Sequence, residues 1–188
     1  MVSAALGDAA DEQIIEHDAC EYGSVGVGFV KIGFAGITDI THAERYLRAA
    51  VRGVQDGVPH PCGVVAVAYA DTGGLTSVDP SALVHAAARA GATGVLLDTA
   101  HKDGPGLVRL VSPGTLTSWV ALAHGAGLTA AVAGKVTADD LPWLFETGAD
   151  IVGVRGAACE NERSSRVNER KVRALAQATL TCRAIAQR

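Results

Sequence analysis

Cysteine and histidine are sparse in this chain and stand far apart. The 188 residues contain four cysteines and six histidines, with no CxxC pair and no Cys/His cluster at metal-ligand spacing. This scarcity argues against a structural zinc site, and no metal or organic cofactor is expected. It also favours reduced thiols and a cytoplasmic location. The cysteines are Cys20, Cys62, Cys159 and Cys182.

Long apolar runs and an excess of positive charge are also missing. No apolar run reaches the roughly 18 residues that cross a bilayer, although 48% of the residues are hydrophobic. The N-terminal stretch has no basic region and turns acidic at once, unlike a signal peptide. A formal net charge of -4 gives no basis for binding nucleic acid or an anionic membrane. We therefore expect a single globular domain over residues 1–188, with neither nucleic acid nor membrane as a partner.

Short apolar runs alternate with helical periodicity along the whole chain. Runs rich in Val, Ala, Ile and Gly predict strands buried on both faces, at 2–8, 26–34, 63–71, 93–100, 128–136 and 150–158. The helical pattern predicts helices between or after them, at 41–55, 79–90, 116–126, 138–147 and 167–186. Several of these helices end in a glycine, the usual residue after a helix C-terminus. Such alternation predicts an α/β fold with a parallel sheet.

Two architectures fit this alternation, the closed (β/α)8 barrel and the open doubly wound sheet. No GxGxxG follows the first strand and no Walker loop appears, so the nucleotide-binding open sheet lacks support. Most predicted strands end in a polar residue, and barrel active sites are built on that rim. These residues are Asp8, Lys31, Asp71, Asp98, Lys135 and Arg155. We predict a TIM-type barrel, of which about six of the eight βα units are visible.

Lysine is rare, yet it is concentrated near the predicted strand ends. The chain has 12 arginines but four lysines, and Lys31, Lys102 and Lys135 lie in or just after predicted strands. Burial lowers the pKa of a lysine, and the free amine attacks carbonyls. In "LLDTAHKDG" (96–104), Asp98 ends a strand and Lys102 follows in the loop. Together with Lys31 these residues suit carbonyl chemistry on a small sugar or triose. Alternatively, Asp98 caps the next loop and Lys102 is a solvated charge.

Glycine-rich loops follow the last two predicted strands. They are "AGKV" (133–136) and "GVRGAA" (153–158), and each carries one basic residue. Barrels often hold a phosphate in the loops after their last two strands. The sequence therefore predicts a phosphate site formed by Gly134, Lys135, Gly153, Arg155 and Gly156. The alternative is a pair of ordinary tight turns that need glycine for backbone freedom.

Six motifs resemble the (5-formylfuran-3-yl)methyl phosphate synthase family in order and spacing. They are "VSAALGD", "FVKIGFAG", "GVVAVAYAD", "LLDTAHKDG", "LTAAVAGKV" and "DIVGVRGAAC", and they extend over nearly the whole chain. The resemblance implies a TIM-type barrel that condenses two molecules of glyceraldehyde 3-phosphate into a phosphorylated furan aldehyde. That product leads to methanofuran-type one-carbon cofactors. The family works through a lysine Schiff base, and Lys31, Asp98 and Lys102 match its active-site positions.

The chain departs from the family at its N-terminus. Family members begin with two further strands, the second of which carries an Asp-x-Lys-x-Pro segment with the Schiff-base lysine. Met1 stands directly before what would be the third strand. The resemblance therefore implies a barrel without its first two βα units, active as a synthase only in a longer form. The apolar first and last strands would then lack a neighbour, so we also expect homo-oligomers. Two alternatives remain open. One is a non-catalytic phosphate-binding relative, and the other is a different class I aldolase-like enzyme on triose phosphates with Lys102 as nucleophile.

Overall fold

A computed structural model gives the fold, and it describes residues 2–57, 61–72, 76–101 and 103–186. Six parallel strands form one sheet in which the spatial order follows the chain order. The strands are β1 (Ser3–Asp8), β2 (Phe29–Gly33), β3 (Gly63–Tyr69), β4 (Gly94–Asp98), β5 (Thr129–Val132) and β6 (Ile151–Val152). The predicted α/β fold with six parallel strands is confirmed.

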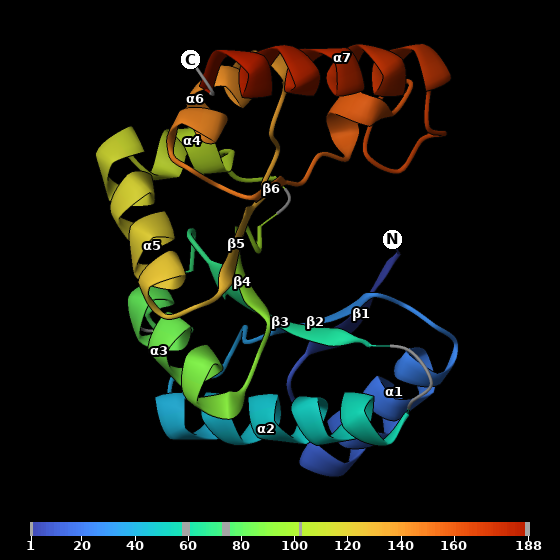
Figure 1. The fold of residues 1–188 in the computed structure, drawn as a ribbon, viewed down its shortest axis with the longest axis vertical. Coiled ribbons are helices and arrows are strands. Elements are labelled where there is room, and N and C mark those ends of the chain that lie inside the picture. The colour runs from blue at the N-terminus through green and yellow to red at the C-terminus, as the bar shows by residue number, and fades with distance from the viewer. Residues whose placement is uncertain (1, 58–60, 73–75, 102, 187–188) are drawn as a thin grey trace.

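Helices connect consecutive strands and lie on the outer side of the curved sheet (Figure 1). The larger helices are α1 (Glu12–Ser24), α2 (Ile40–Asp56), α3 (Pro80–Ala90), α5 (Pro113–Gly125), α6 (Leu141–Glu146) and α7 (Glu169–Ala186). A short helix α4 (Leu107–Leu110) and two 3-10 turns, η1 (Ala138–Asp140) and η2 (Gly156–Ala158), lie in loops. In Figure 1 the helices surround the sheet on three sides, and the inner face of the sheet is turned toward the fourth side.

Local sequence sets the ends of these helices. Asp79 caps α3 by accepting hydrogen bonds from Ser81 N–H (3.0 Å) and Ala82 N–H (2.9 Å), and Pro80 occupies the first turn. Gly91 ends α3 in the left-handed conformation at φ 81°, which costs glycine little. The predicted glycine C-cap is therefore present at this helix.

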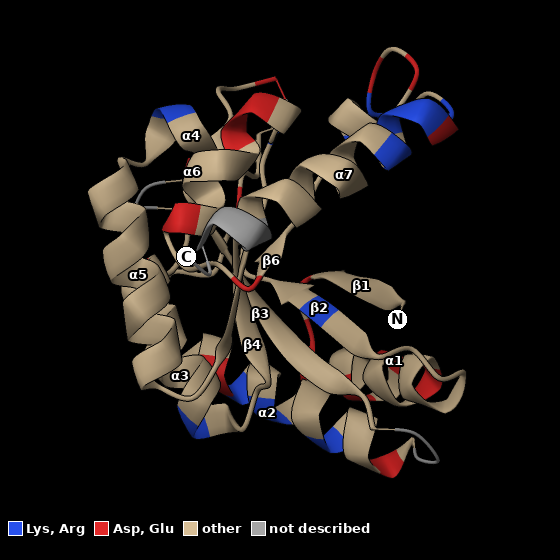
Figure 2. Ribbon diagram, turned by 45° about the horizontal axis from the view of Figure 1, so that its top comes forward, with Lys and Arg blue, Asp and Glu red and all other residues tan. Residues whose placement is uncertain are grey.

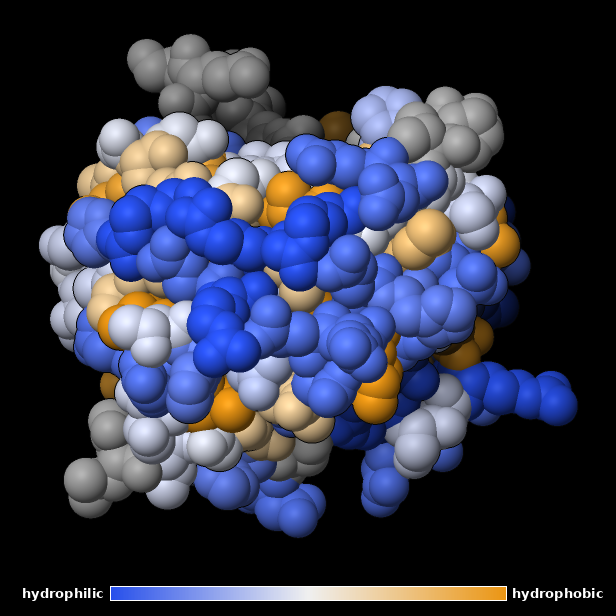
Figure 3. Space-filling model, turned by 90° about the horizontal axis from the view of Figure 1, so that it is seen from below, coloured by the Kyte–Doolittle hydropathy of each residue, from blue (hydrophilic) through white to orange (hydrophobic). Residues whose placement is uncertain are grey.

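Helices α1 and α2 pack closely against each other. Gly53 of α2 faces the backbone of Glu16 and the methyl group of Ala19 on α1. Arg45 and Arg52 of α2 pair with Glu12 and Glu16 of α1 on the outside of this contact. Figure 2 shows basic segments on α2 and acidic segments on α1. Figure 3, seen from below, shows that hydrophilic side chains cover most of this side of the molecule and that its apolar spots are scattered.

The two faces of the sheet differ in burial. On β2, Val30 and Ile32 point outward and have no exposed surface, whereas Phe29 and Lys31 point inward and are half-buried. The same alternation continues on the neighbouring strands. The outer positions, fully or almost fully buried beneath the helices, include Val64, Ala66, Val95, Leu97, Ala130 and Val132. The core therefore lies between the sheet and the helices, and the inner face of the sheet is less buried than the outer face.

Some elements differ from the sequence-based predictions. Helix α1 was not among the predicted helices, because small residues such as Ala19 and Gly23 form part of its buried side. Strand β6 is confined to two residues, since the backbone turns into η2 soon after it.

Within the described part of the chain, no helix combines the length and hydropathy needed to span a membrane.

Candidate functional site

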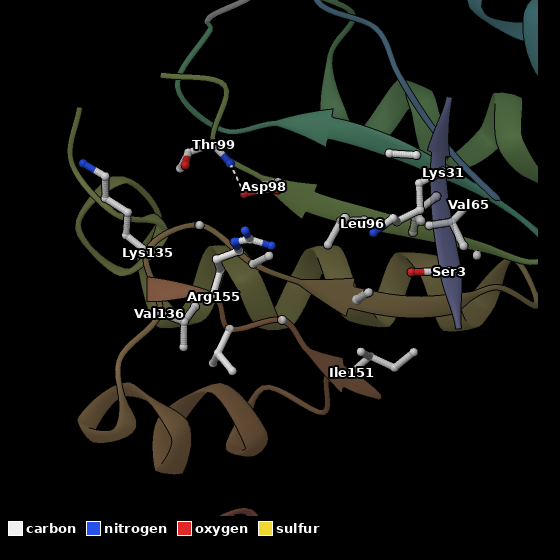
Figure 4. Close-up of a pocket in the computed structure, with 18 of the residues that line it drawn as sticks. Ser3, Lys31, Val65, Leu96, Asp98, Thr99, Lys135, Val136, Ile151 and Arg155 are labelled. Atoms are coloured by element: carbon white, nitrogen blue, oxygen red, sulfur yellow. Dashed lines mark hydrogen bonds between the residues drawn. The ribbon is translucent and has the colours of Figure 1, made fainter. Parts of the chain in front are cut away.

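The inner face of the sheet forms the wall of a cavity of about 970 Å³. That volume lies at the upper end of the range for small-molecule sites. Small residues from several strands leave this space open, and polar groups stand near the carboxyl ends of the strands (Figure 4). The cavity is lined by, among others, Ser3, Ala5, Lys31, Asp98, Thr99, Ala131, Gly134, Lys135, Gly153, Arg155, Gly156 and Arg163.

Lys31 stands in the middle of β2, not at its end as the sequence suggested, and points into this cavity. It is in register with Ala5 on β1 and Val65 on β3, and its neighbours Val30 and Ile32 face the helices. In Figure 2 most of the sheet is uncharged apart from a basic segment on β2. The side chain is half-buried among apolar and small residues, and Figure 4 shows it beside Val65 and Leu96. An amine thus projects from a rigid strand into an enclosed space.

Asp98 ends β4 and lines the same cavity. Its carboxylate accepts a hydrogen bond from Thr99 N–H at 2.7 Å, and its carbonyl accepts one from Ala70 N–H at 2.9 Å. The side chain therefore both caps the following turn and faces the cavity. No ion pair joins it to Lys31 in the described part of the structure, and Figure 4 shows the two at separate points along the inner face. Lys102, the third predicted residue of this group, lies outside the described residues.

Gly134 and Lys135 form a tight turn after β5. Both have left-handed backbone conformations, at φ 111° and 53°. A Cβ on Gly134 would lie 2.9 Å from Cγ2 of Thr99 and 3.3 Å from Cβ of Leu107, so the close packing also requires glycine. The ammonium of Lys135 donates a hydrogen bond to the carbonyl of Gly104. In Figure 4 this side chain points away from Arg155, so the turn lines the cavity while the ammonium lies at its outer edge.

Gly153, Arg155 and Gly156 lie at the end of β6 and in the turn η2. Gly153 N–H donates to the carbonyl of Val132 at 2.7 Å, which keeps the chain against β5 beyond the last strand residue. The Nε of Arg155 donates to the carbonyl of Arg163 at 2.9 Å. Figure 4 shows the guanidinium of Arg155 on the same side of the pocket as Asp98. The structure thus brings the loops after β5 and β6 to one end of the cavity.

A second polar group, missed as a unit in the sequence, lies at the ends of β1 and β3. The hydroxyl of Tyr69 donates to the carboxylate of Asp8 at 2.8 Å, and Ala35 N–H donates to the same oxygen at 3.1 Å. Burial first, and then the hydrogen bond to Asp8, raise the pKa of the Tyr69 hydroxyl well above its usual value. Tyr69 is therefore a neutral hydrogen-bond donor. In the sequence, Tyr69 stands two residues before Asp71. Because side chains two apart on a strand point to the same face, this spacing could have indicated Tyr69 as a site residue.

Asp71, which the sequence placed on the rim, anchors the loop after β4. Its two carboxylate oxygens accept Ala100 N–H at 2.7 Å and His101 N–H at 2.8 Å. These contacts hold the residues that follow Asp98 against the end of β3. Among the described residues, no group of three or more His, Cys, Asp or Glu side chains could hold a metal ion. The chemistry available in the cavity comes from amines, guanidinium groups, carboxylates and backbone donors.

A family model described as 4-HFC-P synthase matches residues 1–176. The chain belongs to this family. The resemblance predicted from its sequence motifs is therefore confirmed.

Full-length relatives agree with this assignment. The chain is 36% identical over 180 residues to the (5-formylfuran-3-yl)methyl phosphate synthase of Methanopyrus kandleri, covering 94% of this chain and 76% of the relative. It is 35% identical over 178 residues to that of Methanocaldococcus jannaschii, covering 93% and 75%. A relative from Kitasatospora aureofaciens is 46% identical over 135 residues, which is 72% of this chain but 53% of the relative. The chain thus spans about half to three quarters of the length of these relatives.

Solved structures confirm the barrel-type fold. The 3-hexulose-6-phosphate synthase of Salmonella typhimurium is similar at TM-score 0.58 and 17% identity, over 89% of this chain and 69% of that one. The deoxyribose phosphate aldolase of Aeropyrum pernix is similar at TM-score 0.58 and 19% identity, over 81% and 62%. At such identities the likeness concerns the fold alone. The six strands are therefore part of a TIM-barrel-type sheet, as predicted.

Proposed function

We propose that this chain forms the greater part of a (5-formylfuran-3-yl)methyl phosphate synthase that condenses two glyceraldehyde 3-phosphate molecules. The relatives named above support the product, and the cavity supports a small phosphorylated carbonyl compound as substrate. No metal or organic cofactor enters this proposal. Counting atoms, two such trioses give the furan phosphate with loss of one phosphate and two water molecules. The reaction therefore needs carbon–carbon bond formation, eliminations and several proton transfers.

The main support for the proposal is that one cavity is lined both by the half-buried amine of Lys31 and by the guanidinium of Arg155. Lys31 lies among apolar and small groups on the inner face. A lysine in this place can donate a hydrogen bond to the carbonyl oxygen of a bound substrate or take part in proton transfer. Arg155 and the turns at Gly134, Gly153 and Gly156 lie at the other end of the same cavity. An ester phosphate bound there would direct the carbonyl carbon of a triose inward, toward the sheet.

Asp98 has the geometry of a proton carrier in this scheme. One carboxylate oxygen is engaged by Thr99 N–H, which fixes the side chain at the end of β4. Among the described residues no group donates a hydrogen bond to the other oxygen, so it is available to a bound substrate. A fixed carboxylate beside a bound aldehyde can accept a proton from carbon and return it to oxygen.

In the family the Schiff-base lysine lies on a segment that is not part of these 188 residues. We propose that Lys31, Asp98 and the phosphate loops hold and activate substrate, and that Schiff-base turnover takes place in a longer form. A Schiff-base adduct on Lys102 in the 188-residue chain would instead support the class I aldolase-like alternative, in which that lysine is the nucleophile. Phosphate binding without any adduct would support the non-catalytic alternative.

The test is reductive trapping. The 188-residue chain, and a form extended by the corresponding N-terminal segment of a relative, are incubated with glyceraldehyde 3-phosphate and borohydride. Intact mass and peptide mapping then locate any lysine adduct, and furan product is followed by chromatography. We expect an adduct and product in the extended form, and neither in the 188-residue chain. Product formed by the 188-residue chain would contradict the proposed need for a longer form.

A matched pair of variants isolates the amine in the extended form. Lys31→Arg keeps the charge but removes the amine that can be deprotonated, and it should abolish product formation. Arg173→Lys is the control, because Arg173 pairs with Glu169 on the exposed surface of α7 and is not part of the cavity lining. Equal activity of the two variants would remove Lys31 from the mechanism.

A further inference from the structure

A short loop beyond η2 closes on itself beside the cavity. Cys159 and Val167 form an isolated antiparallel bridge. Glu160 N–H donates to the carbonyl of Arg166 at 2.9 Å, and Asn168 N–H donates to the carbonyl of Ala158 at 2.8 Å. We call residues 159–167 the strap. These cross-links give it the character of a small hairpin with a defined shape.

Further hydrogen bonds fix both the tip and the base of the strap. At the tip, Ser165 Oγ accepts Asn161 N–H at 3.0 Å and donates to the carbonyl of Glu162 at 2.6 Å. At the base, the ammonium of Lys171 on α7 donates to the carbonyls of Cys159 and Glu160. Arg163 lies within this tip, so its position is set by the strap.

The strap also fixes Arg155. The carbonyl of Arg163 accepts the Nε–H of Arg155 at 2.9 Å and faces the buried thiol of Cys159 at 3.8 Å. Nε is thereby occupied, and the two terminal nitrogens of Arg155 stay available for a ligand. Because the acceptor is a main-chain carbonyl, the anchor does not depend on the side chain at position 163.

Arg155 and Arg163 differ from the helical arginines that form ion pairs. Five helical arginines pair with glutamates, in Arg45–Glu12, Arg48–Glu44, Arg52–Glu16, Arg89–Glu44 and Arg173–Glu169, whereas Arg109 and Arg170 have no such pair among the described residues and do not line the cavity. Arg155 and Arg163 both line the cavity, and neither forms an ion pair with a carboxylate among the described residues. Two like charges at one rim repel each other unless an anion lies between them.

We propose that Arg163 is a specificity-determining residue, which together with Arg155 clamps the phosphate of the substrate. A phosphate monoester offers three acceptor oxygens and up to two negative charges, enough for two guanidinium forks. A neutral triose would leave both cations uncompensated. The identity of the ester rests on the proposed function, whereas the recognition of a phosphate group by Arg163 does not.

The strap provides its own control residue. Arg163→Gln removes a guanidinium from the cavity rim and retains the backbone anchor for Arg155. Arg166→Gln removes the same charge from the same strap at a position that is not part of the cavity lining. Binding of inorganic phosphate to each variant is measured by phosphorus NMR titration, and folding is checked by thermal melting.

We expect Arg163→Gln to weaken phosphate binding by roughly ten- to a hundredfold, the range of a charge-assisted hydrogen bond, and Arg166→Gln to leave it within about twofold of the wild type. In an active extended form, Arg163→Gln should raise KM for glyceraldehyde 3-phosphate and leave the slow reaction of unphosphorylated glyceraldehyde unchanged. Equal loss in both variants, or no loss in either, would overturn the clamp. Phosphate binding that depends on Arg163, without furan formation by the extended form, would instead overturn the proposed function and leave the clamp standing.

Discussion

Replacing Gly53 by alanine should destabilise the protein, although alanine is the better helix former. Gly53 lies within α2 and faces α1. A Cβ at this position would overlap the carbonyl oxygen of Glu16, and it would lie 2.9 Å from the methyl group of Ala19. The obstacle is the backbone of α1, so no side-chain rotation relieves it. The two helices must move apart.

The size of the effect follows from two opposing contributions. Alanine in place of glycine within a helix gains about 1 kcal/mol, and an extra methyl group in a well-packed contact costs about 1–3 kcal/mol. Leu47 and Ala50 on α2 are fully buried, so a shift of α2 would also disturb their packing. We expect a net loss of about 1–2 kcal/mol in the free energy of unfolding. For a chain of this size that lowers the melting temperature by roughly 2–8 °C.

Urea titration followed by circular dichroism measures this change, and Gly125→Ala is the matched control. Gly125 is the last residue of α5, and a Cβ there meets no atom within 4 Å. This variant should be as stable as the wild type or more stable by up to about 1 kcal/mol. If Gly53→Ala proves as stable as Gly125→Ala, the close contact between α1 and α2 described above is wrong.

Three further outcomes are expected. Arg155→Ala should weaken binding of phosphate esters by about one to two decades, measured by calorimetry, since a charge-assisted contact contributes roughly 1.5–3 kcal/mol; unchanged affinity would remove it from the phosphate site. Burial raises the pKa of Asp150, but the Ala130 N–H and His124 outweigh it and lower that pKa below 3.8. Asp150→Asn should therefore lose stability at neutral pH, and the difference from wild type should shrink as the pH falls below 3.8; a difference that is constant with pH would refute this. The purified chain should self-associate through its edge strands at micromolar concentration, by light scattering, and Ile151→Lys on β6 should reduce this; a wild type that stays monomeric would contradict it.

The sheet could be predicted from the sequence because each strand is a short run of Val, Ala and Ile between turn residues. The helices were harder where small residues face the core. On α1 the buried positions are Ile15, Ala19 and Gly23, a pattern with little hydrophobic contrast. Helix α5 begins at Pro113, three residues before the predicted start, because the side chain of Ser112 accepts Thr115 N–H and caps it.

The candidate site could be predicted in part. Alternation along the strands places Lys31 and Asp98 on one face of the sheet, and the loops after β5 and β6 meet at one end by topology alone. Contacts made through loop backbone could not be predicted. The hydrogen bond from Arg155 to the carbonyl of Arg163 depends on the shape of the strap, and the contact of Tyr69 with Asp8 spans 61 residues of sequence.

The division between the two faces of the sheet has a functional consequence. Outward residues such as Ile32 and Leu97 have almost no exposed surface and hold the helices in place. Inward residues such as Ala5 and Ala131 are small, which keeps the cavity open and lets Lys31 reach into it. Enlarging an outer residue would disturb packing first, whereas enlarging an inner alanine would fill the space for a ligand at little structural cost. Stability and ligand binding are therefore encoded by alternate residues of the same strands.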